Sequence, residues 1–374
     1  MSAPISRWIA APLGPDVEGA LDRLAALDDV ARVAVMPDVH LADSVCVGCV
    51  TATRTTLLPE AVGGDIGCGM LALRFDVTLD ALDRHAAARL LHHLGRTIPV
   101  AQHPSADAAL PAELAERPLS AASLRKLAGT IGRVQLGTLG RGNHFVELQR
   151  GDDDGALWLM LHSGSRGIGQ AIRDHHRARA EPAAGGLASL SADAPAGRDY
   201  LADHAWARDW ARASRRLMAE RVAAGVADVL GADVDPTSRR ECDHNHVVAE
   251  EHGGERLWVH RKGALSARAG EPGIIPGSMG SPSHHTSGRG EPTSLCSSSH
   301  GAGRALSRGD ARRSISSAAL ERQIAGVWFD RRMADALREE APAAYTDIGR
   351  VMRAQHPLTR IERTLRPLLS FKGG

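Results

Sequence analysis

Residues 63–70 read Gly63-Gly64-Asp65-Ile66-Gly67-Cys68-Gly69-Met70, and the fold assignment starts from this stretch. Its glycines let the backbone approach other segments closely, so that the Asp65 carboxylate and the Cys68 thiolate can converge on one point. A divalent ion accepts both ligands. The structural alternative is a turn with a hydrogen-bonded Asp and a small buried Cys. The stretch therefore predicts a loop between strands and a candidate metal site.

The segments around this stretch alternate between β-favouring runs bounded by turn residues and runs with apolar residues at helical spacing. The expected strands are 33–36, 45–50, 145–148, 157–161 and 257–260, and the expected helices are 79–94, 200–230, 316–339 and 348–355. Residues 181–197 are expected to form a loop or lid. The candidate functional residues come from at least five separated segments. This dispersal favours an α+β fold, with one interleaved domain over residues 1–374, mixed sheets, flanking helices and a central metal-containing cleft.

Composition excludes several classes of protein. The 374 residues contain no apolar run of membrane-spanning length, so we expect neither a membrane segment nor a signal peptide. Five cysteines do not suggest a disulfide framework and indicate a reducing cytoplasm. The 45 basic and 44 acidic side chains nearly cancel, and aromatic residues are only 3%. Any nucleic acid would therefore be bound locally, through its backbone and by Arg, because rings for base stacking are scarce.

Three histidines in polar loops or at strand ends extend the candidate metal site. His144 lies at the entry to an expected strand, His162 at a strand exit, and His244 in a polar cluster that could be mistaken for an HNH nuclease signature. Each alone is at least as plausible as a structural histidine. With Asp65 and Cys68 they form a ligand set suited to Zn²⁺ or Mn²⁺, and the carboxylate favours Mn²⁺. Five ligands are too many for one tetrahedral site, which suggests two ions that share a bridging ligand.

A further histidine, His300, follows three serines and precedes small residues and Arg304. If a helix begins near Gly301, its amides favour a phosphate at His300, and Arg304, Arg308 and Arg312 share one helix face. A neutral imidazole is a competent nucleophile toward phosphorus. The segment around His300 is equally typical of a phosphate-binding loop. The three arginines are equally typical of a solvated helix face.

Three other pairs of cysteines or histidines are not expected to form functional sites. Cys46 and Cys49 have the spacing of a redox or zinc motif, but no second pair completes a zinc site, and the flanking valines indicate a strand. The adjacent histidines at 92–93 lie on an expected helix, where neighbours diverge, and those at 284–285 lie in an expected loop.

Together these segments resemble the RtcB family of GTP- and manganese-dependent RNA ligases, which includes the catalytic subunit of the tRNA-splicing ligase complex. The resemblance runs from Met36-Pro37-Asp38-Val39-His40 to Phe371-Lys372-Gly373-Gly374, about nine tenths of the chain. It rests on six motifs: DIGCG at 65–69, GNHFVE at 142–147, HSGSRG at 162–167, HRKGA at 260–264, IPGSMG at 275–280 and HGAGR at 300–304.

The resemblance implies roles for individual residues. One Mn²⁺ would be held by Asp65, Cys68 and His144, and the other by Cys68, His162 and His244. His300 would attack the α-phosphorus of GTP, and Arg166, Arg261 and Arg304 would contact the RNA backbone. The residues expected around the nucleotide are Asn143, His144, Phe145, Val146, Glu147, His244, Asn245, Pro276, Gly277, Ser278, Met279, Ser283, His300, Gly301, Ala302, Gly303 and Lys372.

The implied reaction joins an RNA 3′-phosphate or 2′,3′-cyclic phosphate end to a 5′-hydroxyl end. GMP passes from GTP to His300 and then to the RNA 3′-phosphate, after which the 5′-hydroxyl displaces GMP. In-line transfer beside the metals requires His300 within about 6 Å of the ligand cluster. The resemblance also allows for an activating helper protein. The rival hypotheses are a Mn²⁺-dependent phosphoesterase or nuclease acting on RNA ends without guanylylation, and an RNA-binding paralogue with reduced catalysis.

Two places depart from the family pattern. The loop after His40, residues 41–44, lacks the usual basic residue, which puts a phosphate contact there in doubt. Arg141 replaces a small residue, and it would reshape the nucleotide pocket or add an anion contact. The chain is also short for the family, which suggests a divergent paralogous branch.

Overall fold

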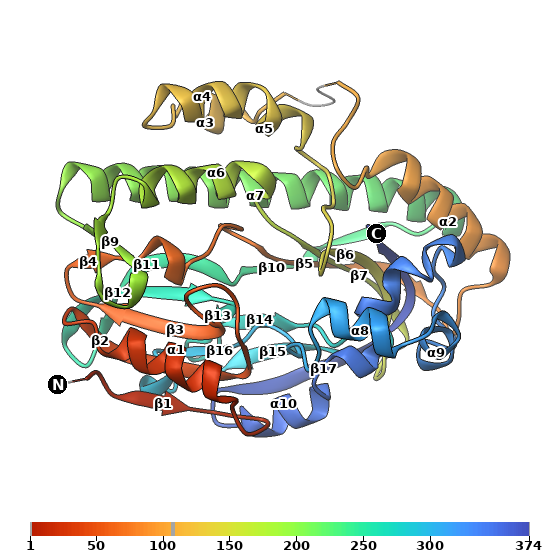
Figure 1. The fold of residues 1–374 in the computed structure, drawn as a ribbon. Helices are drawn as coiled ribbons and strands as arrows, with labels where there is room; N and C mark the ends of the chain where they lie inside the picture. Colours follow the sequence, from red (N-terminus) through yellow and green to blue (C-terminus); the bar gives the residue numbers. More distant parts are fainter. Residues whose placement is uncertain (1, 106–108, 374) are drawn as a thin grey trace.

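The computed structural model describes residues 2–105 and 109–373, and two large sheets organise them (Figure 1). The five-stranded sheet has the order β1-β2-β3-β12-β11. β1 pairs with β2 in parallel and the other pairs are antiparallel, so the sheet is mixed. Helix α1 packs on it through a core that includes Leu21, Leu24 and Val33. The bounds are β1 (Ile5–Arg7), α1 (Pro15–Ala25), β2 (Val30–His40), β3 (Val47–Thr53), β11 (Asn245–His252) and β12 (Glu255–Lys262).

The seven-stranded sheet has the order β10-β5-β7-β6-β17-β15-β14. Helices α2 and α7 pack on it through a core that includes Leu71, Leu159 and Val222. The long helix α7 has Pro195 in its first turn and ends at Gly231 in the left-handed conformation, both of which favour those boundaries. The bounds are β5 (Gly69–Thr78), α2 (Arg84–Thr97), β6 (Phe145–Gly151), β7 (Ala156–Ser163), α7 (Pro195–Leu230), β10 (Val234–Asp243), β14 (Pro272–Ile275), β15 (Ser283–Gly288) and β17 (Thr359–Lys372).

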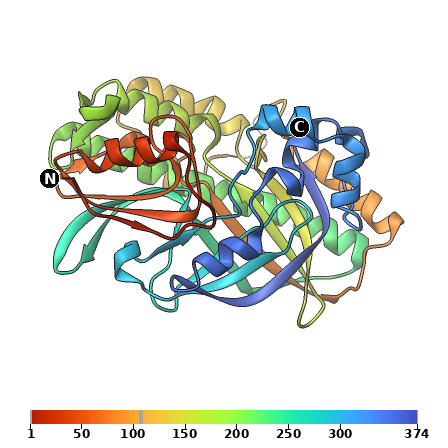
Figure 2. The ribbon, with the colours of Figure 1, turned by 60° about the horizontal axis from the view of Figure 1, so that its bottom comes forward.

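Shorter elements surround the two sheets. Figure 2 shows the C-terminal strand β17 ending beside the blue helices that include α8 and α9. The remaining strands are β4 (Thr56–Leu57), β8 (Glu181–Pro182), β9 (Ala188–Ser191), β13 (Ala264–Ser266) and β16 (Ser297–Ser299). The remaining helices are α3 (Ala112–Ala115), α4 (Ala122–Gly129), α5 (Ile131–Val134), α6 (Arg166–Arg177), α8 (Arg308–Ser314), α9 (Ser317–Gln323) and α10 (Ile348–Ala354), with 3₁₀ turns η1 (Pro59–Ala61), η2 (Ala184–Gly186), η3 (Pro292–Ser294), η4 (Arg331–Met333), η5 (Ala336–Glu340) and η6 (Pro342–Ala344).

The prediction of an α+β fold with mixed sheets and flanking helices is confirmed. The single helix expected over 316–339 is wrong, because α9 ends at Gln323. Gly326 then takes a φ of 90°, and the Trp328 amide donates to the Leu368 carbonyl, which pulls the chain onto β17. The helix expected near Gly301 begins only at Arg308, where the Ser307 side chain caps it. The expected loop 181–197 contains β8, η2, β9 and the start of α7.

Among the described residues, no helix is both long and apolar enough to cross a membrane.

Candidate metal centre and nucleotide pocket

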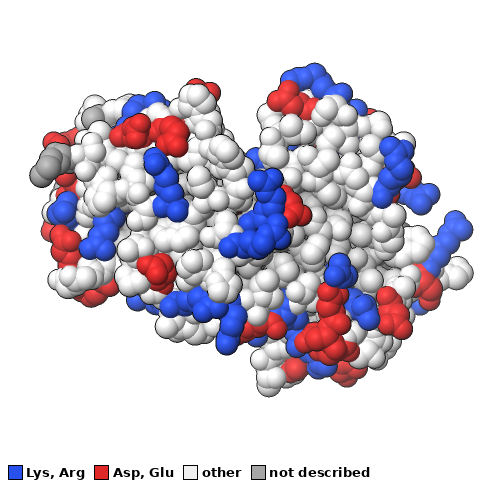
Figure 3. Space-filling view, turned by 90° about the horizontal axis from the view of Figure 1, so that it is seen from below, with Lys and Arg blue, Asp and Glu red and all other residues white. Residues whose placement is uncertain are grey.

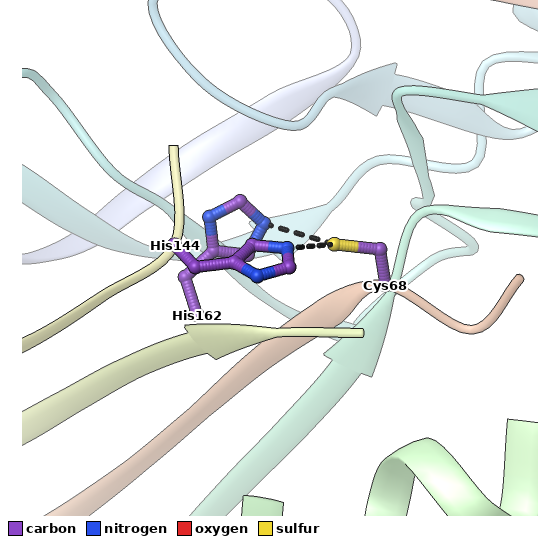
Figure 4. A group of neighbouring side chains, drawn as sticks. All are labelled: Cys68, His144 and His162. Carbon is purple, nitrogen blue, oxygen red and sulfur yellow. Dashed lines mark hydrogen bonds between the residues drawn. The ribbon is translucent and has the colours of Figure 1, made fainter. Parts of the chain in front are cut away.

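Cys68, His144 and His162 gather at one end of the seven-stranded sheet (Figure 4). Cys68 directly precedes β5, His144 directly precedes β6, and His162 lies near the end of β7. These three strands are neighbours, and their register pairs His162 with both Met70 and Phe145. The Cys68 Sγ lies 3.3 Å from Nε2 of His162 and 3.5 Å from Nε2 of His144. All three side chains are buried and could hold a metal ion.

The other two expected ligands extend this group on opposite flanks. The Asp65 Oδ2 lies 3.0 Å from Nε2 of His144, and the Nε2 of His244 lies 3.3 Å from Nε2 of His162. His244 reaches this point because it links β10 of one large sheet to β11 of the other. The five residues therefore form one contiguous set in which Cys68 is central.

The electrostatics of the cluster fit a cation. His144 and His162 each place Nδ1 against a backbone carbonyl, of Leu139 at 3.0 Å and of Asn143 at 3.1 Å, which orients Nε2 toward the cluster. Burial holds the pKa of His162 and of His244 well below the ordinary value, so both rings are neutral ligands. The Nδ1 of His244 is buried and has no hydrogen-bond partner within the described residues. Neutral imidazoles that converge with a thiol and a carboxylate are a donor set for a borderline divalent ion.

The protonation of Asp65 and Cys68 depends on their burial and neighbours. Burial raises the pKa of Asp65, but the contact with His144 outweighs this effect, so the carboxyl is ionised. Burial and the nearby Asp65 charge raise the pKa of the Cys68 thiol well above its ordinary value. A bound metal deprotonates a thiol ligand outright, so Cys68 becomes an anionic ligand when the ion binds.

His300 lies next to this cluster and is held by a carboxylate from a distant segment. Its ring centroid is 4.6 Å from that of His244, within the distance expected for chemistry beside the metals. The Asp38 Oδ2 lies 2.7 Å from Nδ1 of His300 and accepts the amides of His300 and Gly301 at 3.2 Å each. Asp38 is 1% exposed. The sequence did not single it out as a site residue, and its only signal was its place in the 36–40 motif.

The same contacts correct the expected phosphate site at a helix N-terminus. The amides of His300 and Gly301 already donate to Asp38, and residues 301–307 form no helix. Gly303 has a φ of 71°, and a Cβ there would lie 2.5 Å from the Asp38 carbonyl oxygen. The loop is therefore shaped by its close packing on Asp38, which no other residue type at 303 would allow.

A pocket of about 340 Å³ lies beside His300. Several of the residues expected around the nucleotide do not line it. Val146 packs in the hydrophobic core, and the Ser283 hydroxyl accepts a hydrogen bond from the Gly277 amide. The Asn245 side chain donates to the Asp65 carbonyl and accepts from the Gly263 amide. His144 and His244 belong to the metal cluster. The expected residues that do line the pocket are Asn143, Phe145, Glu147, Pro276, Gly277, Ser278, Met279, His300, Gly301, Ala302, Gly303 and Lys372.

The protein-family model described as tRNA-splicing ligase RtcB matches residues 20–128 and 112–373 of the chain. The chain belongs to the RtcB family. The RNA-splicing ligase RtcB of Escherichia coli strain K12 is 37% identical over all of this chain and 98% of its own. The corresponding protein of Mycobacterium tuberculosis strain H37Rv is 29% identical over 94% and 99%. The tRNA-splicing ligase RtcB of Nanoarchaeum equitans is 26% identical over 92% and 88%. This membership supports an RNA ligase function, and the Cys/His cluster supports a metal cofactor.

Two residues of this RtcB pocket, Glu340 and Tyr345, were missed by sequence reasoning. The buried Glu340 carboxylate accepts the Lys372 ammonium and the Tyr345 hydroxyl at 2.7 Å each, and it lies 3.4 Å from Arg304. Burial raises the pKa of Glu340, but Lys372 and the other partners lower it below its ordinary value, so it remains charged. Glu147 differs, because burial raises its pKa to about 7. No local pattern marks Glu340, which ends the 3₁₀ turn η5 and belongs to none of the six motifs.

A second pocket, of about 440 Å³, borders the cluster at Asp65 and His144. Arg166, expected to meet RNA, lines it together with Arg141 and Arg173. On the face shown in Figure 3, charges of both signs are interspersed, and Lys and Arg side chains gather at the inner end of a hollow.

The expectation that Arg261 contacts RNA is wrong. Its side chain has no exposed surface and donates to the Glu250 carboxylate at 2.6 Å and to the Ser297 hydroxyl at 3.0 Å. Arg304 lines the first pocket, where it is tied to Glu340 and Tyr345.

The loop 41–44 borders the first pocket through Leu41 and Ala42. The loop has no basic residue of its own, but the Lys262 ammonium lies against it. This ammonium donates hydrogen bonds to the carbonyls of Val45 at 2.7 Å and Ala42 at 3.4 Å. Cys46 and Cys49 are buried free thiols in the core beside α1, as expected for structural residues. His284 and His285 were expected in a loop, but they are buried on β15.

Proposed function

We propose that this chain is a GTP-dependent RNA ligase that joins RNA 3′-phosphate or 2′,3′-cyclic phosphate ends to 5′-hydroxyl ends through a GMP–histidine intermediate. The observation that carries the proposal is the position of His300. Its ring is fixed by Asp38, it lies 4.6 Å from the His244 ring, and it lines the pocket beside the cluster. An Asp–His pair can also serve a metal-dependent hydrolase as a general base, so a histidine adduct is the property that distinguishes the two functions.

The roles of Asp38 and His300 follow from their contact. Asp38 keeps the proton on Nδ1 of His300, which leaves the lone pair of Nε2 free to attack the α-phosphorus of GTP. The bond from this phosphorus to nitrogen forms as the bond to pyrophosphate breaks. After a cyclic end has been opened, an RNA 3′-phosphate oxygen displaces Nε2 and takes GMP. The 5′-hydroxyl of the second strand then attacks the 3′-phosphorus, loses its proton, and releases GMP.

In this proposal Asp65, Cys68 and His144 would hold one Mn²⁺ ion, and Cys68, His162 and His244 would hold the other, so Cys68 would belong to both ligand sets. When bound, such ions neutralise the charge that develops on phosphate oxygens. Cys68 and the three histidines are buried, whereas the Asp65 side chain is 32% exposed, and their contacts with one another are already formed, so they would hold the ions with little reorganisation.

The first pocket is the proposed guanylate site. Lys372, Arg304 and Arg308 line it and supply positive charge for phosphates, while Glu340 fixes their positions. Glu147, a carboxyl in the same pocket, suits hydrogen bonding to the base. The five free thiols suit a reducing cytoplasm, and an activating helper protein remains part of the hypothesis.

The test is incubation with GTP labelled at the α-phosphate in the presence of Mn²⁺. We expect a protein-bound label that acid releases, because a phosphoramidate is acid-labile, and its complete loss in His300→Ala. His356→Ala, at an exposed histidine, is the matched control and should keep the label. Absence of any label, with phosphate release from RNA ends instead, would contradict the proposal and favour a Mn²⁺-dependent phosphoesterase.

A further inference from the structure

Arg215, on helix α7, is a fully buried cation to which the proposed function assigns no role. Helix α7 packs on β5 and β7 (Figure 1), and the Arg215 side chain has no exposed surface. A buried guanidinium loses its hydration, which is costly unless its N–H groups are paired. The partners of Arg215 therefore indicate what its burial supports.

Two of these partners are backbone carbonyls that adjoin proposed metal ligands. The Nη1 of Arg215 donates to the Gly67 carbonyl at 2.8 Å and to the Ser163 carbonyl at 3.0 Å. Gly67 directly precedes Cys68, and Ser163 directly follows His162. One guanidinium nitrogen therefore ties the loop before β5 to the end of β7.

The third partner lies on the strand that leads to His244. The Nε and Nη2 atoms of Arg215 lie 3.2 Å and 3.1 Å from Oε1 of Glu241. Glu241 belongs to β10, which ends at Asp243, directly before His244. The Glu241 side chain is 12% exposed, so this ion pair is largely shielded from water. Arg215 therefore links a third segment of the metal cluster to the other two.

The three segments that Arg215 links carry one of the two proposed ligand sets. Cys68, His162 and His244 would hold the same Mn²⁺ ion, which we call the second ion. Asp65 and His144, the ligands that belong only to the first ion, contact each other at 3.0 Å. Neither of them adjoins a bonding partner of Arg215 in the chain. The contacts of Arg215 are therefore centred on the second ion.

We propose that Arg215 is a positioning residue for the second ion, because it fixes the spacing of the segments that carry Cys68, His162 and His244. The inference rests on the proposed function, which assigns these three ligands to one ion. Partners beyond the ligands orient them, and the loss of such a partner lowers metal affinity by about 10- to 100-fold. Helix α7 thus belongs to the metal site without supplying a ligand.

The first test is metal binding to the full chain, by equilibrium dialysis against Mn²⁺ followed by metal analysis. The parent should hold both ions. Arg215→Met should hold the first ion with the affinity of the parent and bind the second about 10- to 100-fold more weakly. Arg216→Met is the matched control, because Arg216 follows on α7 and pairs with the same Glu241 carboxylate at 3.2 Å, but its side chain is 47% exposed. This control should bind both ions as the parent does.

The electron paramagnetic resonance spectrum of bound Mn²⁺ gives a readout that a merely structural role would leave unchanged. Two Mn²⁺ ions that share the Cys68 thiolate are magnetically coupled, whereas one ion alone gives the spectrum of an isolated centre. At the Mn²⁺ concentration that just fills both sites of the parent, Arg215→Met should give the isolated spectrum. Arg215→Lys should recover part of the coupled spectrum, because an ammonium still donates to two carbonyls.

A double variant separates metal positioning from folding. Arg215→Met alone leaves the Glu241 carboxylate without its buried partner, so combining it with Glu241→Gln removes both charges. Without metal, the double variant should unfold at a temperature close to that of the parent, yet it should still lose the second ion.

Three results would overturn the inference. The first is a double variant that keeps both ions with the affinity of the parent, whether or not its metal-free unfolding temperature falls. The second is an equal weakening of both ions, and the third is a parent that binds only one. A parent that binds Mn²⁺ but forms no histidine adduct would instead count against the proposed ligase function, and the binding measurements would still decide the role of Arg215.

Discussion

At the scale of single residues, buried carboxylates hold the side chains to which the proposed function assigns roles. Asp38 holds the His300 ring and two amides of its loop. Glu340 holds Lys372 and Tyr345 in the adjoining pocket. The sequence indicated the reactive members of these contacts, because His300 and Lys372 lie in distinctive motifs. It did not indicate their partners, since Asp38 lies 262 residues from His300 and Glu340 follows no pattern.

Replacing Asp38 with Asn tests the positioning of His300. The amide keeps the size of the side chain but loses the charge that stabilises the Nδ1 proton, so the wrong tautomer of His300 gains population. We expect Asp38→Asn to form the histidine adduct about 10- to 100-fold more slowly, with little change in the GTP concentration at half-maximal rate. Asp28→Asn, at an exposed aspartate, is the control. A rise in the half-saturating GTP concentration with an unchanged maximal rate would refute this role.

At the scale of elements, the strand periodicity was more informative than the helical periodicity. Strand β7 lies inside the seven-stranded sheet and is buried throughout, so its continuous apolar run reflects both covered faces. The expected helix after Ser316 fails because Trp328 bonds β17 instead, a tertiary contact that local spacing does not show. Arg261 fails as an RNA contact for a similar reason, because its strand β12 pairs with β11, which carries Glu250.

The pairing of Glu250 with Arg261 makes stability depend on pH. Burial alone would raise the pKa of Glu250, but Arg261, His252 and Arg268 lower it from 4.5 to about 2. A lowered folded-state pKa stabilises the protein fully above pH 4.5, and this contribution, about 3 kcal/mol, is lost as the pH falls toward 2.

Glu250→Gln should therefore lower the free energy of unfolding at pH 7, and its difference from the parent should shrink as the pH falls from 5 to 3. Denaturant titrations at several pH values measure this difference. The exposed neighbour Glu251 provides the control in Glu251→Gln, which should follow the parent throughout. A difference for Glu250→Gln that stays constant with pH would show that the carboxylate charge is not responsible.

At the scale of the whole molecule, the metal cluster joins the two large sheets. Cys68, His144 and His162 belong to strand ends of the seven-stranded sheet, while His244 lies between β10 and β11 and so connects that sheet to the five-stranded one. The proposed metal ions, which share Cys68, would restrain the two sheets relative to each other. One domain over residues 1–374 stays a prediction.

Metal binding should consequently stabilise the folded protein. Ligands that bind only the folded state raise its stability by about 2.7 kcal/mol at 100 times the dissociation constant, so Mn²⁺ should raise the midpoint of thermal unfolding. Cys68→Ala removes the proposed bridge and should abolish this rise and the binding of both ions, measured by metal analysis. Cys296→Ala, at a free cysteine outside the cluster, should behave as the parent. Two ions retained by Cys68→Ala would contradict the bridging assignment.

The sequence by itself predicted which residue types meet at the cluster, because the family motifs contain Asp65, Cys68 and three histidines in a characteristic order. It also determined the strand and α7 segments, whose periodicity is local. Only the tertiary structure decided that Asp38 holds His300, that Arg261 is buried against Glu250, and that Arg141 shares a pocket with Arg166 and Arg173. The physical reason is that each of these contacts joins different strands, loops or helices, and forms only when those elements have packed against one another.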